Sequence, residues 1–216
     1  MTIGIIGTGN VGATLGRRFA QAGYRVLFGV RDPHTEKVQQ LIREAGENAC
    51  TESIDELPRH ADAIILATPH SALRAVIEQM GKLGSTILVD CTNPIAPGLR
   101  LAVGHSSSGA EQLARWVHDT PVVKAFNTMG WETMADPVFE DGSASMFLCG
   151  DDKKANQAVA NMAAAIGFDP VITGPLQHAR YLEPMAMMWI QMAMKEGFGR
   201  DIAFRLLRRN TEGEGE

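Results

Sequence analysis

Short apolar runs of strand length alternate with amphipathic stretches along most of the chain. The run at residues 2–6 is followed by apolar positions Val11, Leu15 and Phe19, which recur at the spacing of one helix face. Residues 24–30 then form a second apolar run. A strand, a helix and a strand within about 30 residues predict a βαβ unit with a right-handed crossover.

The same alternation continues downstream. We expect further strands at 50–51, 61–67, 85–90, 121–126, 145–149 and 169–173, and helices at 35–45, 71–80, 110–117 and 153–166. This order predicts an α/β fold: one doubly wound, mostly parallel Rossmann sheet of about eight strands. We assign residues 1–175 to that domain, 176–209 to a small helical C-terminal part and 210–216 to a disordered tail.

A glycine motif, Gly7-x-Gly9-x-x-Gly12, joins the first strand to the first helix. Gly7 allows the tight turn, Gly9 lets the backbone approach a pyrophosphate, and Gly12 lets the helix pack closely on the strand. The pyrophosphate would bind the free N–H groups of the helix that begins near Asn10. A strand before the motif and a helix after it favour a dinucleotide site over a purely structural turn.

The residues after the second strand choose between the two nicotinamide cofactors. Arg31 comes first, and Lys37 lies in the next helix. A guanidinium is well suited to a 2′-phosphate, so this pattern favours NADP. Asp32 leaves room for NAD, and an exposed charged turn is the structural alternative.

The carboxyl ends of later strands should line the cofactor crevice. These positions include Ala67, Thr68, Pro69 and His70. We interpret His70 as a loop residue or a ribose contact rather than as a catalytic acid. The amide of Asn93 could bind ribose or nicotinamide, or the Asn-Pro pair could simply open a turn.

Composition narrows the class of protein. The chain has 216 residues, of which 45% are hydrophobic, and a net charge of −5. This is enough for a packed core, and it argues against nucleic acid or an anionic membrane as the main partner. The apolar runs are too short to span a membrane, and the chain enters its first strand without a charged leader, so we expect a cytoplasmic protein.

Neither cysteine nor histidine indicates a metal site. Cys50, Cys91 and Cys149 lack C-x-x-C spacing and look like buried structural thiols. The six histidines are dispersed. We therefore expect no metal.

No acid–base pair for alcohol or carbonyl chemistry is evident. The two tyrosines, Tyr24 and Tyr181, are not part of a Tyr-x-x-x-Lys motif, and we assign no catalytic residue. A flavin or deazaflavin accepts a hydride without a protein acid, because its ring delocalises charge and solvent can supply the proton. A second redox cofactor is therefore the acceptor that we expect.

Four segments carry a resemblance to a known family: Gly4-Ile5-Ile6-Gly7-Thr8-Gly9-Asn10-Val11-Gly12, Phe28-Gly29-Val30-Arg31-Asp32-Pro33, Val123-Lys124-Ala125-Phe126-Asn127-Thr128 with Met134-Ala135-Asp136-Pro137, and Leu182-Glu183-Pro184-Met185-Ala186-Met187-Met188-Trp189-Ile190. Together they resemble the NADPH-dependent F420 reductase family, and the NADPH-binding domain of the STEAP metalloreductases is similar. The resemblance covers nearly the whole chain. It implies hydride transfer between NADP and the deazaflavin coenzyme F420.

The resemblance also implies a set of binding residues. Around the pyrophosphate, Thr8, Asn10 and Val11 would join the glycines, and Arg31 and Lys37 would hold the 2′-phosphate. The residues implied at the ribose and nicotinamide are Thr68, Pro69, Asn93 and Ala125. The deazaflavin ring would lie near residues 127–131, starting at Asn127, and near the helix 183–194.

Two positions depart from the family pattern. Val30 stands in the cofactor site where relatives often have a small polar residue, which weakens one phosphate hydrogen bond. Trp131 stands where the loop usually has a smaller residue, so it could stack on a ring or close the site to F420.

The methionine-rich helix with Trp189 is apolar nearly all round, which favours a core or homodimer-interface helix over a cofactor floor. Reduction of a small imine or carbonyl, and a non-catalytic NADP sensor, are the alternative functions.

Overall fold

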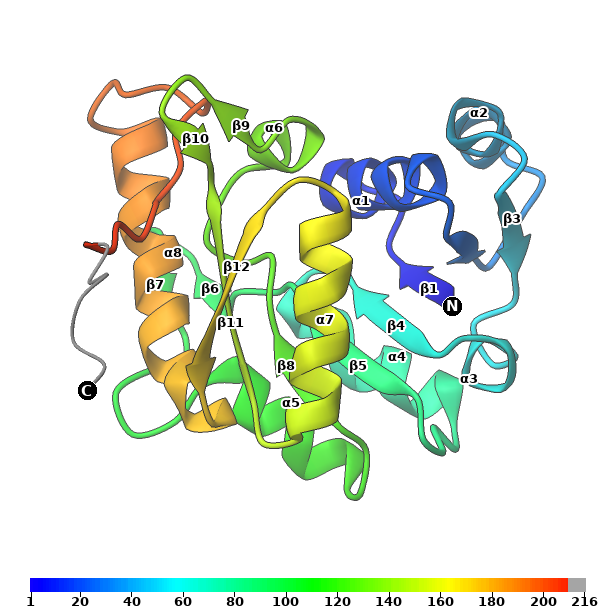
Figure 1. Cartoon of the computed structure of the whole chain (residues 1–216). Coiled ribbons are helices and arrows are strands. Elements are labelled where there is room, and N and C mark those ends of the chain that lie inside the picture. The colour runs from blue at the N-terminus through cyan, green and yellow to red at the C-terminus, as the bar shows by residue number, and fades with distance from the viewer. Residues whose placement is uncertain (210–216) are drawn as a thin grey trace, which may run out of the picture.

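The computed structural model describes residues 1–209 and contains one eight-stranded sheet in the order β12-β11-β8-β5-β4-β1-β2-β3 (Figure 1). All neighbouring strands pair in parallel except β8 and β11. The strands are β1 (Thr2–Ile6), β2 (Arg25–Gly29), β3 (Ala49–Glu52), β4 (Ala63–Leu66), β5 (Ile87–Asp90), β8 (Val122–Lys124), β11 (Ser145–Gly150) and β12 (Asp169–Gly174). The predicted doubly wound Rossmann sheet is confirmed.

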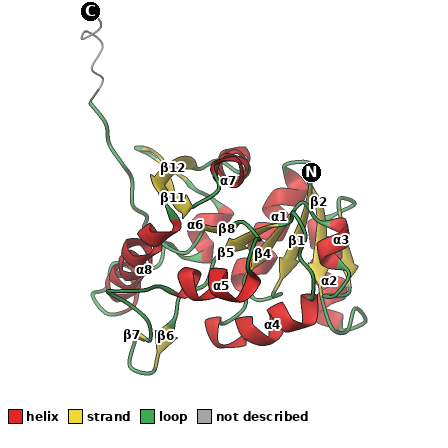
Figure 2. Cartoon of the chain, turned by 90° about the horizontal axis from the view of Figure 1, so that it is seen from below, coloured by secondary structure: helices red, strands yellow, loops and turns green. Residues whose placement is uncertain are grey.

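Two short hairpins lie outside this sheet and were absent from our expectation. They pair β6 (Ile95–Ala96) with β7 (Arg100–Leu101) and β9 (Val138–Phe139) with β10 (Gly142–Ser143). Strands of two residues carry no readable alternation, which is why the pattern did not predict them. Figure 2 shows the β6–β7 hairpin projecting from the body below α8.

The four helices predicted at 35–45, 71–80, 110–117 and 153–166 are found within two residues of these bounds, whereas the short helix at 131–135 was not predicted. The helices are α1 (Asn10–Gln21), α2 (Glu36–Ala45), α3 (Leu57–His60), α4 (Leu73–Met80), α5 (Gly109–Val117), α6 (Trp131–Ala135), α7 (Lys153–Ala165) and α8 (Ala179–Met194), with 3-10 turns η1 (His70–Ala72) and η2 (Leu176–His178). Side chains of Thr35, Ser108 and Asp152 accept from backbone N–H groups and begin α2, α5 and α7.

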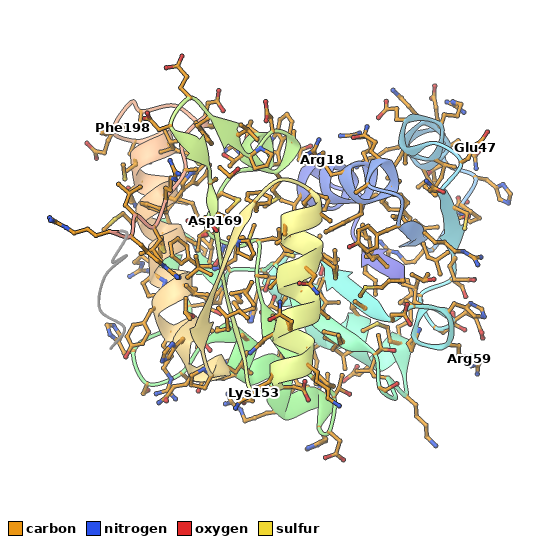
Figure 3. All side chains as sticks on the ribbon, in the orientation of Figure 1. Arg18, Glu47, Arg59, Lys153, Asp169 and Phe198 are labelled. Carbon is orange, nitrogen blue, oxygen red and sulfur yellow. The ribbon has the colours of Figure 1, made fainter. Side chains whose placement is uncertain are left out.

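Two apolar clusters cover the two faces of the sheet. One joins side chains of α1, α2 and α7 to the strands, and the other joins α4, α5 and α8 (Figures 1 and 2). In the first cluster the ring of Phe126 meets Phe19 and Phe168 edge-on, with centroids 6.2 and 6.1 Å apart. Arg18 of α1, labelled in Figure 3, donates to the Ile166 carbonyl at 2.7 Å and ties α1 to the end of α7.

The C-terminal part is only partly helical, which corrects our expectation for 176–209. The helix α8 ends at Met194, and glycines 197 and 199 adopt positive φ. Residues 195–209 then return as an irregular arm past Phe198, labelled in Figure 3. Trp189 Nε1 donates to the Ile202 carbonyl at 2.8 Å, and Ser145 N donates to the Phe204 carbonyl at 3.0 Å. The expected tail at 210–216 lies outside the described residues.

Burial corrects the expectation for the cysteines and distinguishes two faces of α8. Cys91 and Cys149 are buried, but Cys50 is exposed because β3 is an edge strand of the sheet. Within the methionine-rich helix Trp189 is buried, whereas Met188 is 59% and Met194 56% exposed. Over residues 1–209, no helix is both long and apolar enough to cross a bilayer.

Candidate functional site

The glycine turn has the steric requirements that its spacing predicts. A Cβ atom on Gly12 would lie 1.9 Å from the Gly7 carbonyl oxygen, and one on Gly7 would lie 2.4 Å from the Ala67 carbonyl oxygen. Gly7 also has a φ of +112°. At Gly9, by contrast, no protein atom lies within 4 Å of the Cβ position. Gly7 and Gly12 thus serve close packing, while Gly9 leaves space for a ligand.

The N-terminus of α1 is open to an anion. Gly9 occupies the N-cap position, no side chain accepts from the first turn, and that turn holds no acidic residue. Asn10 is exposed and Val11 half-buried at the start of the helix. Uncapped N–H groups at the positive end of a 12-residue helix fit a pyrophosphate without any rearrangement.

A cleft of about 520 Å³ extends from this turn. It lies where the strand order reverses between β1 and β4, the usual ligand position in such sheets. Of the predicted residues, those that line it are Gly7, Thr8, Val30, Arg31, Thr68 and Pro69. Lys37 is exposed in the first turn of α2 but does not line the cleft.

The charged pair after β2 is divided between two roles. Asp32 Oδ1 accepts from the His34 backbone N–H at 2.8 Å and so closes a local turn. Arg31 is exposed at the mouth of the cleft. Both residues line the cleft; the carboxylate has a backbone partner there, and the guanidinium is the group suited to an adenosine phosphate.

The structure brings Asn93 and Asn127 together at the ends of β5 and β8. Asn127 Nδ2 donates to Asn93 Oδ1 at 3.0 Å and to the Leu182 carbonyl at 3.1 Å. Asn93 Nδ2 donates to the Asn127 carbonyl at 2.9 Å. This pair joins two loops to α8, and it shows that Asn93 does more than open a turn.

Other predicted residues have little free surface. Ala125 is fully buried and has no surface to offer a ligand, and Asn127 is 4% exposed. Phe126 between them adopts a φ of +58°, an unusual conformation for a bulky residue, which redirects the chain at the end of β8. Trp131 is half-buried at the start of α6.

A cluster of three buried charges, Lys124, Asp90 and Glu183, lies beside this pair. Lys124 Nζ is 3.0 Å from Asp90 Oδ2 and 3.0 Å from Glu183 Oε1, and it also donates to the Thr92 carbonyl. All three charged side chains are at most 1% exposed. Burial lowers the pKa of Lys124, but the charges of Asp90 and Glu183 and their hydrogen bonds raise it above its usual value. The ammonium is therefore held in its charged form.

Glu183 also holds the start of α5. Its two carboxylate oxygens accept from the N–H groups of Gly109 and Ala110 at 2.9 and 3.1 Å. The cluster thus joins β5, β8, α5 and α8 at the carboxyl edge of the sheet. Our sequence reasoning missed it, although a charge within an apolar strand or an apolar helix is the signal that could have revealed it.

His70 lies on the α5 and α8 side of the crevice, away from the adenosine end. It begins η1, directly after the cleft residues Thr68 and Pro69, but does not itself line the cleft. Burial lowers the pKa of His70, and the charge of Lys124 lowers it too, whereas the charges of Asp90 and Glu183 raise it. The pKa of His70 is lowered overall, because burial has the largest effect.

An open glycine turn, an arginine beside the cleft and a Rossmann sheet are the features of a dinucleotide-binding domain. Residues 2–94 match the model of a family described as NADP oxidoreductase, coenzyme F420-dependent. The N-terminal part of the chain therefore matches this family, in agreement with the expected resemblance.

Two curated relatives illustrate the range of the family. The chain is 27% identical to the F420-dependent NADP reductase of Methanothermobacter thermautotrophicus, over 90% of each chain. It is 31% identical to the metalloreductase STEAP3 of Rattus norvegicus over 86% of this chain, but this covers only 36% of the relative. The chain thus spans about a third of the length of the curated metalloreductases that it matches.

A solved structure supports the same assignment. The chain superposes on a candidate F420-dependent NADP reductase from Arthrobacter sp. FB24 with a TM-score of 0.86 and 28% identity. The match covers 95% of this chain and 99% of the other. The whole fold, including α8, is therefore shared with that protein.

Proposed function

We propose that the protein transfers a hydride between NADPH and a deazaflavin, coenzyme F420, or a flavin. The observation that carries the proposal is the division of the carboxyl edge of the sheet into two parts. One part is an open cleft with an uncapped helix N-terminus and Arg31. The other is a wall of buried, mutually bonded polar groups, in which Lys124, Asp90 and Glu183 have no exposed surface for substrate.

The chain's own residues suit NADPH. Gly9 and the first turn of α1 would bind the pyrophosphate, and Arg31 with Lys37 would bind the 2′-phosphate. Bound NADPH would supply the hydride. The residues that we propose around it are Gly7, Thr8, Gly9, Asn10, Val11, Gly12, Val30, Arg31, Lys37, Ala67, Thr68, Pro69, His70, Asn93, Ala125 and Asn127; Ala125 would act through the backbone, because its side chain is buried.

The second ring would lie between the loop 127–131 and α8. The Asn93–Asn127 pair fixes this loop to α8 through the Leu182 carbonyl. The loop also packs closely on the helix, since a Cβ atom on Gly130 would lie 2.7 Å from the Trp189 ring. A fixed edge of this kind suits an acceptor whose reaction needs positioning more than acid–base help. The similarity to the F420-dependent NADP reductase of Methanothermobacter thermautotrophicus, 27% identity over 90% of each chain, supports a deazaflavin as the acceptor.

Stopped-flow mixing of the protein with NADPH and each of F420, FMN, FAD, Fe(III) and a cyclic imine tests the proposal. We expect rapid oxidation of NADPH with F420 or with a flavin. Oxidation only with the imine would indicate an imine reductase, and oxidation only with Fe(III) a metal reductase. Tight NADPH binding without oxidation by any acceptor would indicate a sensor. Each of these three results would refute the proposal.

The cofactor preference is tested by Arg31→Glu. We expect the Kd for NADPH to rise at least tenfold and the Kd for NADH to change little, because only NADPH carries the 2′-phosphate. Arg59→Glu, which changes an exposed arginine in α3 away from the cleft, is the matched control. Equal losses for both cofactors would contradict the assignment.

We further propose a homodimer that packs through the outer face of α8. Tyr181, Pro184 and Met188 recur there at helical spacing, and Tyr181 is 70% exposed. Exposed apolar side chains in such a stripe are typical of subunit contacts. Analytical ultracentrifugation should show a dimer, and Met188→Lys should convert it into a monomer. A wild-type monomer at micromolar concentration would refute the dimer.

A further inference from the structure

His70 is half-buried at the carboxyl edge of the sheet. Its Nε2 atom is buried without a hydrogen-bond partner. The imidazole therefore lies between the outside of the crevice and the interior behind it.

The buried side of the imidazole faces the charge cluster. A Cβ atom on Gly109 would lie 2.8 Å from His70 Nε2 and 3.2 Å from Glu183 Oε1, so the ring and the carboxylate both lie close to this glycine. The titratable groups that act on His70 are Asp90 and Glu183 on β5 and α8 and Lys124 on β8. With two carboxylates and one ammonium, this cluster carries a net charge of −1 and stabilises a proton on His70.

His70 is half-buried at this edge, and the charges of the cluster act on its imidazole. Lys124, Asp90 and Glu183 have almost no exposed surface and cannot reach a substrate. Tyr24 packs edge-on against Phe19, 5.7 Å between centroids, in the core under α1. A proton that leaves or enters the crevice through the protein would therefore pass by His70.

We propose that His70 exchanges the proton that accompanies hydride transfer between NADPH and the flavin-type acceptor. This inference rests on the proposed function. The C4–H bond of the dihydronicotinamide breaks, and the hydrogen with its electron pair forms a new C–H or N–H bond on the acceptor ring. A ring nitrogen of the reduced acceptor then takes a proton from the His70 imidazolium, which regains one from solvent. In the reverse direction neutral His70 removes that proton.

The direction of the pH effect follows from this role. Because burial lowers the pKa of His70, the imidazolium is a minority form at neutral pH and becomes abundant below it. The single-turnover rate of acceptor reduction by NADPH should therefore rise as the pH falls through that pKa. The rate of NADP reduction by the reduced acceptor should fall over the same range.

Single-turnover oxidation of saturating NADPH by F420 or FMN, measured between pH 5 and 9, tests the inference with His70→Gln. We expect a 10-fold to 100-fold lower rate at saturating NADPH and a flat pH profile, with Tm unchanged. The loss is partial, because solvent can also protonate the acceptor. Added imidazole should restore part of the rate. His60→Gln, an exposed histidine on α3, is the control and should behave as wild type.

A second readout does not depend on turnover. NMR titration of the His70 ring should give a lowered pKa in the wild type, and Glu183→Gln should lower it further because one negative charge is lost. A normal pKa that does not respond to Glu183→Gln would overturn the inference.

The two proposals fail in different ways. Wild-type rates and an unchanged pH profile in His70→Gln would overturn the role of His70 alone. A His70→Gln variant that loses only affinity for NADPH would also overturn the role of His70 alone, since that result identifies a ribose contact. Wild-type protein that oxidises NADPH with neither F420 nor a flavin would overturn the proposed function, and the proton role with it.

Discussion

Replacing Lys124 by Met should destabilise the protein strongly, and the loss should depend on pH. The substitution keeps the volume of the side chain but leaves Asp90 and Glu183 buried without their shared cation, which is 3.0 Å from each. Breaking a buried charge pair in this way costs about 3–5 kcal/mol. Asp90 keeps the Thr92 N–H at 2.9 Å, and Glu183 keeps two N–H groups of α5.

The magnitude can be worked from the protonation of one carboxyl group. With two carboxylates and no ammonium, the folded variant would hold one of them protonated. A carboxyl with an unfolded pKa of about 4 must then take up a proton, at about 1.4 kcal/mol per pH unit above that value. This gives a loss of about 4 kcal/mol at pH 7 and about 1.5 kcal/mol at pH 5. The folded pKa is the raised one, so stability falls as the pH rises.

Urea unfolding at pH 5 and pH 7, followed by fluorescence and circular dichroism, measures both losses. Lys124→Met with Asp90→Asn should recover most of the stability at pH 7, since only one carboxylate then remains. Lys82→Met, at an exposed site, should change the free energy of unfolding by less than about 0.5 kcal/mol. A loss below about 1 kcal/mol at pH 7, or a larger loss at pH 5 than at pH 7, would refute the reasoning.

Three further predictions concern the glycine turn, the loop 127–131 and the thiols. Gly9→Ala should fold normally, since its Cβ meets no protein atom within 4 Å, but fluorescence titration should show at least tenfold weaker binding of NADPH. Gly12→Ala should lower Tm sharply. A low Tm for Gly9→Ala with a normal Tm for Gly12→Ala would contradict the two roles. Trp131→Ala should change the single-turnover rate with F420 at least threefold at constant Kd for NADPH, and unchanged kinetics would exclude contact with the ring. A thiol reagent should modify only Cys50 in the native protein, because Cys149, for example, is buried with its pKa raised to about 12; rapid modification of two or three thiols would show that the core opens.

Much of the fold could be predicted because local pattern and tertiary structure agree. The apolar runs at β1, β2 and β4 are strands buried along their length except at Thr2 and Arg25, and such strands read as continuous apolar segments in a parallel sheet. The β6–β7 and β9–β10 hairpins escaped prediction because two-residue strands have no period. The arm 195–209 escaped it because its contacts, such as Trp189 with Ile202, depend on a side chain from another element.

The position of the candidate site could be predicted, but the roles of several of its side chains could not. The glycine turn, Arg31, and the strand ends at Thr68 and Pro69 could be located, because in a parallel sheet the topology brings consecutive carboxyl ends to one edge. The roles of the side chains at that edge could not be predicted from the sequence. Asn93 offered two interpretations until its pairing with Asn127, 34 residues away, was visible.

By itself, the sequence determined the Rossmann class and located the glycine turn and the arginine after the second strand, because the steric needs of a glycine turn and strand periodicity are local properties of the chain. Only the tertiary structure decided that Lys124, Asp90 and Glu183 form one buried cluster and that His70 lies beside it. Burial and charge proximity depend on residues far apart in the chain, and their effect on pKa exists only once these residues share one low-dielectric interior.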